Sequence, residues 1–579
     1  MWFRRSRETS AVRALGVIAV VSTAVVAFTA TASGASDDDV AGQASAAASE
    51  EYVVAFSGTA DAATAAIEAA GGTVESLTPE VGAALVTSTN GAFVDDVQTQ
   101  GGIRGAMLNH SVGTVRPGMP HRFAAERPSY GELADGGPGS AGQLSGTGPA
   151  AEPLADRQWD MAMIGATPDG AHRTATGEGV DVGIIDTGID GRHPDLAPNF
   201  DAERSRNFTT DIPAVDGPCE VASCVDPADV DDRGHGTHVA GIVAAANNNF
   251  GIAGVAPDAT LVNVRAAQDS GYFFLYETVR ALVYAGDAHL DVVNMSFYTD
   301  PWLYNCASRD EYLEGTVTDD ELTQQRLVRE LVLGAVAYAH SMGVTLVGSA
   351  GNEHRDLAAP TRVDETSPDY PPDAARPRTV ANTCLNLPNE APQVIGVSAL
   401  GPSTAKADYS NYGLGDVEIS APGGWFRDYA GTPAFQTPGN LVLSTYPLAA
   451  AIAQELADPK GDPTDEFSVK YCDDQGVCGF YTYLQGTSMA APHVTGVAAL
   501  IIEAQGRLTR HGGRALDPAI VAAVLAGTAE DHACPAGGVE DYTDEGRTPD
   551  WNAVCEGTTD VNGLYGEGIV DAEAAVGLH

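Results

Sequence analysis

Short apolar runs rich in β-branched residues recur after residue 150, without the alternation of apolar and polar residues that marks a half-exposed strand. Such runs are typical of strands buried on both faces, as in a parallel sheet covered by helices. Longer segments with helical periodicity lie between them, which is the element order of an α/β fold. The expected strands are residues 180–185, 260–264, 291–295, 344–347 and 394–397, and the expected helices include residues 236–246, 275–285 and 327–340. Since no repeat or further linker interrupts this pattern, residues 151–579 are expected to form one enlarged domain.

A smaller unit is expected ahead of this domain, within residues 33–115. Its strands and helices follow the order β-α-β-β-α-β, which is that of a small ferredoxin-like α+β module. The expected strands are residues 52–56, 73–77, 83–87 and 107–115, and the expected helices are residues 62–70 and 92–99. Residues 116–150 then alternate proline with glycine and lose all periodicity, so we expect an exposed linker there.

The first 32 residues have the three parts of a secretory signal peptide. Four arginines, the last at position 13, precede an apolar run over residues 15–28, and small residues follow it. This run is shorter than the about 18 residues that a spanning helix needs, which disfavours the alternative of a retained membrane anchor. We therefore expect residues 1–32 to be removed on export, leaving an extracellular protein without a membrane span.

The composition is globular but strongly acidic. Hydrophobic residues make up 44% of the chain, and 78 Asp and Glu residues face 31 Lys and Arg, which gives a formal net charge of −47. Binding to nucleic acid requires a basic stripe that displaces counterions, so nucleic acid is excluded as a general partner. An anionic membrane surface is disfavoured for the same reason.

Eight cysteines in an exported chain favour four disulfides. Three pairs lie close together within loops, and local pairing of these leaves Cys306 with Cys384. Zinc is the alternative, but only the first pair approaches the spacing of metal ligands, and no second half-site follows it. The three local pairs are Cys219 with Cys224, Cys472 with Cys478, and Cys534 with Cys555.

An acid and a histidine lie where an α/β fold places chemistry. Asp186 ends the first expected strand, at the carboxyl edge of the sheet. Its Asp-Thr-Gly motif alone also fits a turn, or half of an aspartic-protease dyad. His235 lies between two glycines at the start of a helix, which leaves its ring approachable, whereas His238 is expected to be a buried packing residue. The spacing of these histidines does not fit the zinc-protease motif His-Glu-x-x-His.

A serine and an asparagine complete the set of candidate residues. Ser488 opens a helix of small residues, where its hydroxyl and backbone N–H lie at the positive end of the helix dipole. An ordinary N-cap is the alternative for this serine. Asn352 follows the strand at residues 344–347, where it either caps a turn or donates to a developing oxyanion.

The order Asp…His…Ser, with an Asn between His and Ser, resembles the subtilisin-like serine proteases. The motifs Ile-Asp-Thr-Gly at Asp186, His-Gly-Thr-His at His235 and Gly-Thr-Ser-Met-Ala at Ser488 match the three signature blocks of that family. The resemblance covers residues 158–575. It implies a three-layer α/β subtilisin-like fold with a mainly parallel sheet, preceded by a ferredoxin-like inhibitory propeptide at residues 33–115.

The resemblance also implies a function. The chain is expected to be a secreted serine endopeptidase that works through an acyl-enzyme and processes itself from a zymogen. Ser488 would attack the scissile carbonyl, His235 would take its proton, and Asp186 would orient the imidazole. Asn352 and the Ser488 N–H would hold the oxyanion. The expected substrate-binding residues are Asn294, Met295, Ser296, Ala350 and Gly351.

A structural calcium site is implied as well. The Asn-rich turn at residues 247–251 follows the helix of His235, and oxygen donors on a loop suit a hard cation. The alternative is a polar turn that only ends the helix. The expected ligands are the side chains of Asp195 and Asn248 and the carbonyls of Ala246, Phe250 and Ile252.

Departures from the family pattern leave two further functions open. Phe297 and Tyr298 follow Ser296 where compact relatives have a glycine beside the specificity pocket. The altered rim favours, as an alternative, a dedicated protease that processes one exported precursor. An inactive binding protein with the subtilase fold is a remote alternative, since all four chemical residues are present. We expect a monomer whose partners are polypeptide substrates and its own propeptide.

Overall fold

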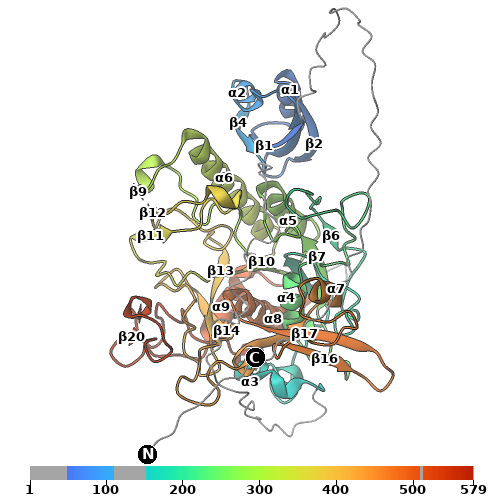
Figure 1. The fold of residues 1–579 in the computed structure, drawn as a ribbon, viewed down its shortest axis with the longest axis vertical. Coiled ribbons are helices and arrows are strands. Elements are labelled where there is room, and N and C mark those ends of the chain that lie inside the picture. Colours follow the sequence, from blue (N-terminus) through green and yellow to red (C-terminus); the bar gives the residue numbers. More distant parts are fainter. Residues whose placement is uncertain (1–48, 110–151, 509–512, 578–579) are drawn as a thin grey trace, which may run out of the picture. The chain divides into compact units, whose positions relative to one another are not determined.

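The structure is a computed structural model that describes residues 49–109, 152–508 and 513–577 (Figure 1). The predicted signal peptide at residues 1–32 and the predicted linker at residues 116–150 lie outside these ranges. None of the helices in the described ranges is both long and apolar enough to cross a membrane.

The small N-terminal unit has the predicted ferredoxin-like α+β fold. Its four strands form an antiparallel sheet in the order β2-β3-β1-β4. Val54, Ile67 and Phe93 lie in the core between the helices and the sheet. A Cβ at Gly72 would lie only 2.6 Å from the Phe93 ring, so this close packing requires glycine. The elements are β1 Glu50–Phe56, α1 Ala60–Ala69, β2 Gly72–Thr78, β3 Ala83–Ser88, α2 Phe93–Gln98 and β4 Ile103–Leu108.

The fourth strand begins earlier than the sequence predicts. The expected strand covers residues 107–115, whereas β4 is Ile103–Leu108, and residues after 109 are not described. Arg104 and Gly105 interrupt the apolar pattern, so the sequence does not indicate where the strand starts. In the structure, Arg104 donates to two carbonyl oxygens of the β2–β3 turn, and a Cβ at Gly105 would lie 2.9 Å from Leu327. Tertiary contacts therefore override the local pattern.

Seven strands form the central sheet of the large domain, in the order β14-β13-β10-β8-β5-β7-β6. Every pairing in it is parallel, which confirms the predicted sheet. Later strands continue on both sides of β5, so the order reverses beside it, and α/β folds place their sites at such a point. The strands are β5 Asp181–Ile185, β6 Arg206–Asn207, β7 Thr260–Arg265, β8 Val292–Met295, β10 Thr345–Ser349, β13 Val394–Leu400 and β14 Ile419–Pro422.

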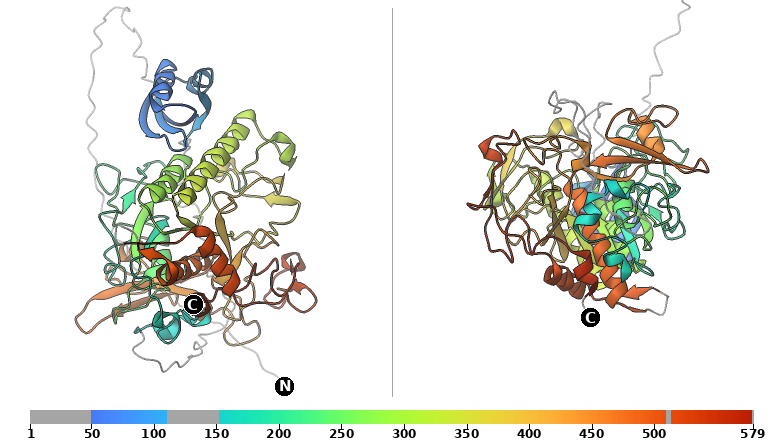
Figure 2. Two further views of the ribbon diagram at one scale, coloured as in Figure 1. Left: turned by 180° about the vertical axis from the view of Figure 1, so that it is seen from behind. Right: turned by 90° about the horizontal axis from the view of Figure 1, so that it is seen from below.

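Helices cover both faces of this sheet, which gives the predicted three layers (Figure 2). Val182 and Ile184 of β5 belong to a core with α4 and α8, whereas Ile185 belongs to a core with α5 and α6. Neighbouring strand residues point to opposite faces, so a continuous apolar run is the pattern that fills both cores. These helices are α4 His235–Ala244, α5 Leu275–Asp287, α6 Asp319–Ser341 and α8 Thr487–Gln505.

Helix α6 begins eight residues before the predicted start at residue 327. Thr318 and Glu321 form a capping box there, in which each side chain accepts a hydrogen bond from the other residue's backbone N–H. Asp319, Asp320 and Glu321 form the first turn of the helix, where acidic side chains suit the positive end of its dipole.

Smaller sheets and helices surround the central layers. One three-stranded sheet combines a strand from the segment between β8 and β10 with two strands from the segment after β10, and another consists of a hairpin and an additional strand before α8. The strands are β9 Tyr312–Glu314, β11 Thr361–Asp364, β12 Arg378–Ala381, β15 Val442–Thr445, β16 Ser468–Cys472, β17 Cys478–Leu484, β18 Arg507–Leu508, β19 Arg514–Ala515, β20 Val539–Glu540 and β21 Ala553–Val554. The remaining α-helices are α3 Trp159–Met163, α7 Leu448–Ala453, α9 Pro518–Thr528 and α10 Ala572–Gly577.

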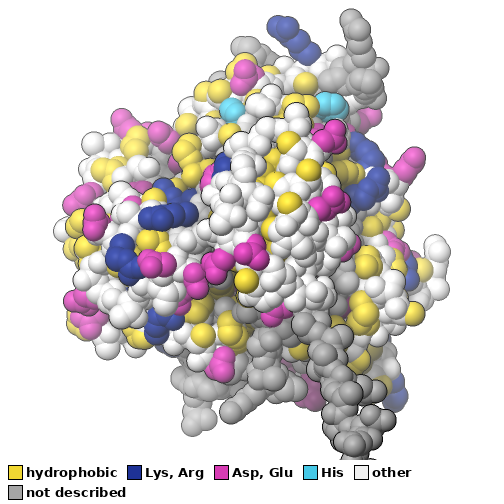
Figure 3. Space-filling view, turned by 90° about the horizontal axis from the view of Figure 1, so that it is seen from above, with side chains coloured by type: hydrophobic (Ala, Val, Ile, Leu, Met, Phe, Trp, Pro, Cys, Tyr) yellow, Lys and Arg dark blue, Asp and Glu magenta, His cyan; other side chains and the backbone are white. Residues whose placement is uncertain are grey.

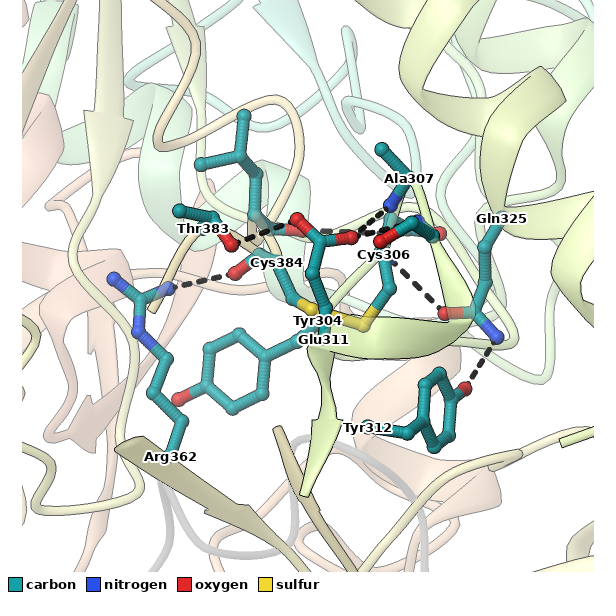
Figure 4. The surroundings of a disulfide bond; sticks show 12 residues. Tyr304, Cys306, Ala307, Glu311, Tyr312, Gln325, Arg362, Thr383 and Cys384 are labelled. Carbon is teal, nitrogen blue, oxygen red and sulfur yellow. Dashed lines mark hydrogen bonds between the residues drawn. A yellow bond between two sulfur atoms is a disulfide. The ribbon is translucent and has the colours of Figure 1, made fainter. Parts of the chain in front are cut away.

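All four predicted disulfides are present. The buried Cys306–Cys384 bond joins the segment after β8 to the segment after β10, and the Glu311 carboxylate lies beside it (Figure 4). Glu311 accepts from the backbone N–H groups of Ala307 and Ser308. All eight cysteines, Cys219 and Cys224 among them, are bonded in these four pairs, so the structure supports disulfides and not the zinc alternative.

The acidic side chains on one face of the molecule are spread out rather than gathered in one patch (Figure 3). On the face seen in Figure 3 they are scattered among neutral and apolar side chains, and basic side chains lie between them. A dispersed negative charge of this kind suits a solvated surface.

Candidate active site

Asp186 and His235 form a buried pair at the carboxyl edge of the sheet. Asp186 directly follows β5, and His235 is the first residue of α4. His235 Nδ1 lies 2.7 Å from Asp186 Oδ1, and the same oxygen accepts from the Thr187 N–H at 2.7 Å. Asp186 is fully buried and His235 is 3% exposed. The carboxylate therefore fixes both the ring position and the Nδ1–H tautomer of the imidazole.

Two glycines allow His235 to lie so close to the sheet. Gly234 has φ +97°, and a Cβ there would lie 2.3 Å from the Tyr446 ring. A Cβ at Gly236 would lie 2.2 Å from the Gly188 carbonyl oxygen. Gly236 thus allows α4 to approach the end of β5, and Gly234 leaves room for the Tyr446 ring.

Asp231 organises the loop before His235, and the sequence reasoning missed it. Its Oδ1 accepts from Thr187 Oγ1 at 3.0 Å, the Arg233 N–H at 3.1 Å and the Gly234 N–H at 2.8 Å. Its Oδ2 accepts from the backbone N–H and the hydroxyl of Thr237, at 2.9 and 2.6 Å. This one side chain therefore ties the loop both to the strand of Asp186 and to α4. Only its position four residues before His235 could have signalled that role.

Ser488 lies in the first turn of α8, which packs against α4. The helix begins at Thr487, so the Ser488 N–H is among the four that have no partner inside the helix. Ser296 Oγ donates to the Ser488 carbonyl at 3.1 Å and anchors this turn to the end of β8. Ser488 is 3% exposed, which matches the burial of His235.

Asn352 is held by the residue next to Ser488. Its Oδ1 accepts from the N–H and the hydroxyl of Thr487, both at 2.9 Å. Because the amide oxygen is directed at Thr487, the NH₂ group, which lies on another side of the same planar group, is the part of Asn352 that can donate to a substrate. Asn411, which the sequence reasoning also missed, donates to the Ala350 carbonyl at 2.9 Å and steadies this turn.

The residues expected to bind substrate lie at the ends of β8 and β10. The Asn294 side chain points into the protein, where it donates to Ser296 Oγ at 2.9 Å and accepts from Thr495 Oγ1 at 3.0 Å. The Gly351 N–H donates to Thr487 Oγ1 at 3.1 Å. Met295 is buried in the core and Ala350 is 6% exposed. Any contact of this strand with a substrate would therefore be made by the backbone.

The predicted calcium ligands come together in an oxygen-rich cradle. Asp195 Oδ2 accepts from the Ile252 N–H at 3.1 Å and from the Tyr481 hydroxyl at 2.8 Å. Within the described ranges, Asp195 Oδ1, Asn248 Oδ1 and Glu152 Oε2 are buried without a hydrogen-bond partner. Burial, together with the charge of Glu152, raises the pKa of Asp195 to about 8. Glu152 and Tyr481 were missed by the sequence reasoning.

These residues fit a hard cation. Three buried oxygens without donors from separate segments, two of them on carboxylates, form a donor set that suits a divalent ion. The predicted ligands Ala246 and Phe250 lie in the same loop; the Ala246 N–H donates to the Asp195 carbonyl at 2.8 Å, and the Phe250 ring packs edge-on against Tyr471. The cradle can therefore bind a metal.

His238 is a buried packing residue, as the sequence predicts. It is fully buried, and its Nε2 lies 3.0 Å from the Thr482 carbonyl. Burial lowers the pKa of His238 to about 3, so the ring is neutral at physiological pH.

This geometry first defines a class of protein. A buried acid–histidine pair at the carboxyl edge of a parallel sheet, with a serine in the first turn of the neighbouring helix, is the arrangement of serine peptidases in the order Asp, His, Ser. The subtilase family model matches residues 177–567, more than half of the chain. The chain belongs to the subtilase family and is a subtilisin-like serine endopeptidase.

Individual relatives are distant. Thermitase of Thermoactinomyces vulgaris is 28% identical over 334 residues, which cover 58% of this chain and 78% of thermitase. Fervidolysin of Fervidobacterium pennivorans is 28% identical over 358 residues, which cover 61% of this chain but only 38% of fervidolysin. The crystal structure of the epidermin leader peptide processing serine protease of Staphylococcus aureus superposes with a TM-score of 0.59 at 20% identity, covering 92% of this chain and 98% of that one. This likeness shows the fold.

Proposed function

We propose that this chain is a secreted endopeptidase that uses Asp186, His235 and Ser488 as its catalytic triad and is made as a self-processed zymogen. The observation that carries the proposal is the 2.7 Å contact of His235 Nδ1 with Asp186 Oδ1, beside the helix that has Ser488 in its first turn. Export is proposed from the sequence of residues 1–32.

The chemistry proceeds by acyl transfer. Ser488 Oγ attacks the scissile carbonyl while His235 Nε2 takes its proton, and the imidazolium then gives that proton to the leaving amine. Asp186 stays ionised and stabilises the imidazolium through Nδ1–H. Water then hydrolyses the acyl-enzyme by the same steps, with His235 again acting as the base.

The oxyanion is held by the Ser488 N–H and the Asn352 amide. Thr487 fixes the orientation of Asn352 before the substrate arrives, so no reorganisation is needed as charge develops. A side-chain donor of this kind is worth about 3–4 kcal/mol in a subtilisin.

The substrate is proposed to bind as an extended strand between the end of β8 and the 350–351 turn. Asn294, Met295 and Ser296 would line one side, and Ala350 and Gly351 the other. Backbone pairing of this type recognises main chain rather than sequence.

The small N-terminal unit is proposed to be an inhibitory propeptide. It makes contacts with the large domain inside one compact unit that begins at Ala48. Thr78 Oγ1 donates to the Tyr276 hydroxyl at 3.2 Å, and Arg104 pairs with Glu330. Asn109 Oδ1 accepts from the Tyr276 N–H at 3.3 Å, so the unit caps the first turn of α5.

We also propose that the Asp195 cradle binds calcium. Asp195, Asn248 and Glu152 would supply side-chain oxygens, and the carbonyls of Ala246, Phe250 and Ile252 would complete the set named by the family resemblance. A bound cation compensates the buried negative charge and steadies the loop that follows α4.

The test of the triad is the Ser488→Ala variant. It should accumulate as full-length precursor, whereas Ser341→Ala, an exposed serine at the end of α6, should mature normally. A serine-directed phosphonate should label Ser488 in the mature parent. Maturation of pure Ser488→Ala, or failure of the label, would contradict the proposal.

A narrower function is favoured by the pocket rim. The Phe297 ring stacks on Phe273 with 3.9 Å between centroids, and the Tyr298 hydroxyl donates to Asp369 at 2.7 Å. This packed aromatic rim suits a dedicated processing protease with a restricted substrate. Broad digestion of unrelated denatured proteins would exclude that narrower function and leave the general endopeptidase.

A further inference from the structure

A second group of acids lies apart from the Asp195 cradle. Asp211, Glu220 and Asp226 come from the segment before α4, and Asp269 follows β7. One carboxylate oxygen from each lies within 4.8 Å of all the others. In a calcium site with oxygens at about 2.4 Å from the ion, two ligands lie at most about 4.8 Å apart. The four oxygens are therefore spaced as ligands of one ion.

Asp211 provides an independent indication of a ligand. Its side chain is 4% exposed, and neither carboxylate oxygen has a hydrogen-bond partner among the residues that the structure describes. The Asp211 N–H donates to the Cys224 carbonyl at 2.7 Å, which fixes the backbone of this residue. Its carboxylate lies among the other three acids. A buried carboxylate without donors is costly, and a cation is the partner that removes this cost.

The protein's own positive charge in this cluster is too small to balance it. Arg265 is fully buried, lies 3.1 Å from Asp226 Oδ2 through NH1, and pairs with Asp269 through NH2. One guanidinium therefore serves two of the four acids. Burial, followed by the charges of neighbouring acids, raises the pKa of Asp211 to about 6, and burial raises that of Asp269 to about 7 despite the pairing with Arg265.

We propose that Asp211, Glu220, Asp226 and Asp269 form a second cation site, which binds a hard divalent ion such as calcium. Carboxylate oxygens without sulfur or nitrogen donors select calcium over zinc or copper. The Cys219–Cys224 disulfide closes the loop that carries Glu220 and limits its freedom before the ion binds. Arg265 holds Asp226 and Asp269 in place from the other side.

The ion would act on stability rather than on chemistry. Asp226 begins the short segment that leads through Asp231 to His235. A cation at the cluster would tie this segment to the loop after β7. Occupancy should therefore raise the unfolding temperature and protect the segment from hydrogen exchange.

The experiment counts bound ions. The full chain is made with Ser488→Ala so that it cannot digest itself, stripped of metal, and titrated with calcium by calorimetry, with bound calcium also measured after gel filtration. Asp211→Asn removes one charge at nearly constant shape. Asp195→Asn removes the first cradle independently. Asp474→Asn, at the exposed tip of the β16–β17 hairpin, is the charge-matched control.

Two equivalents of calcium are expected for the parent and for Asp474→Asn, one for Asp211→Asn and one for Asp195→Asn. Glu220 is exposed, so Glu220→Gln should fold normally, and it should weaken one of the two binding events at least about tenfold. A parent that binds one equivalent, lost in Asp195→Asn, would overturn the second site and leave the first. An Asp211→Asn protein that keeps two equivalents, or unchanged binding in Glu220→Gln if Asp211→Asn does not fold, would overturn it as well.

Discussion

Two loops of this protein hold a buried acid in opposite ways. Asp231, which lies beside the proposed catalytic residue His235, has five hydrogen-bond donors on its two oxygens. Asp195, in the proposed calcium cradle, has an oxygen that receives none from any residue in the described parts of the chain. The folded chain therefore supplies hydrogen-bond donors to both oxygens of Asp231, whereas one oxygen of Asp195 keeps a negative charge that a cation could compensate. A change at Asp231 should therefore have an effect both with and without calcium, whereas a change at the cradle should have its effect mainly when calcium is scarce.

The largest effect is expected at the catalytic pair itself. Asp186→Asn should lower kcat by about 10⁴-fold, because the amide no longer stabilises the imidazolium or the required tautomer. The loss should be the same in excess calcium and in weak chelator. Steady-state kinetics of the purified variant on a peptide amide substrate checks this. Because the variant should not process itself, it is matured beforehand by added active enzyme. If added calcium restored the activity of the variant, the proposed difference between the two loops would be wrong.

A smaller kinetic effect is expected at the oxyanion donor. Asn352→Ala should lower kcat by about 10²–10³-fold with KM little changed, because the donor acts on charge that develops in the transition state. Thr487→Val keeps the backbone N–H that orients Asn352 and loses only the hydroxyl, so its loss should be smaller. Equal losses for the two variants would show that Asn352 acts by supporting α8 and not as a donor.

Asp231→Ala should destabilise the protein with or without calcium. It leaves buried N–H groups of Gly234 and Thr237 without their acceptor, which costs about 1–3 kcal/mol for each buried group left unsatisfied. Thermal unfolding in calcium and in EDTA measures the shift. A shift confined to EDTA would show that an ion, and not Asp231, holds this loop when calcium is present.

The pH dependence of stability should separate the same two regions. Without calcium, the folded-state pKa of Asp195 is about 8, above its ordinary value of 3.8. The folded state then holds a proton that the unfolded state has lost, so Asp195 makes stability fall as pH rises from about 4 to about 8. Calcium binds the ionised carboxylate and should flatten this slope. Unfolding temperatures measured against pH, with and without calcium, check it; parallel curves would contradict an ion at Asp195.

The sequence predicted the central fold and the candidate catalytic residues because both lie in short contiguous patterns. Asp186, His235 and Ser488 each lie within a motif at the start or end of an element. The residues that it missed act across long separations: Tyr481 reaches Asp195 over 286 positions, and Glu152 contacts Asn249 over 97. Neither side chain is unusual in its local context. Only the packed structure reveals such partners, as it does for β4, whose start is fixed by tertiary contacts of Arg104 and Gly105.

The smallest effect, and the finest test of the comparison, is expected for Tyr481→Phe. The Tyr481 hydroxyl donates to Asp195 Oδ2 at 2.8 Å, and a Cβ at Gly251 would lie 1.9 Å from it, so the hydroxyl fits tightly into the cradle. Removing it takes one donor from a carboxylate that already has too few, which should cost about 1 kcal/mol in EDTA. In calcium the ion compensates that carboxylate, and the cost should shrink. Tyr471→Phe, on the neighbouring strand β16, is the matched control and should behave like the parent in both conditions. An equal loss in calcium and in EDTA would mean that Tyr481 supports the hairpin rather than the cradle.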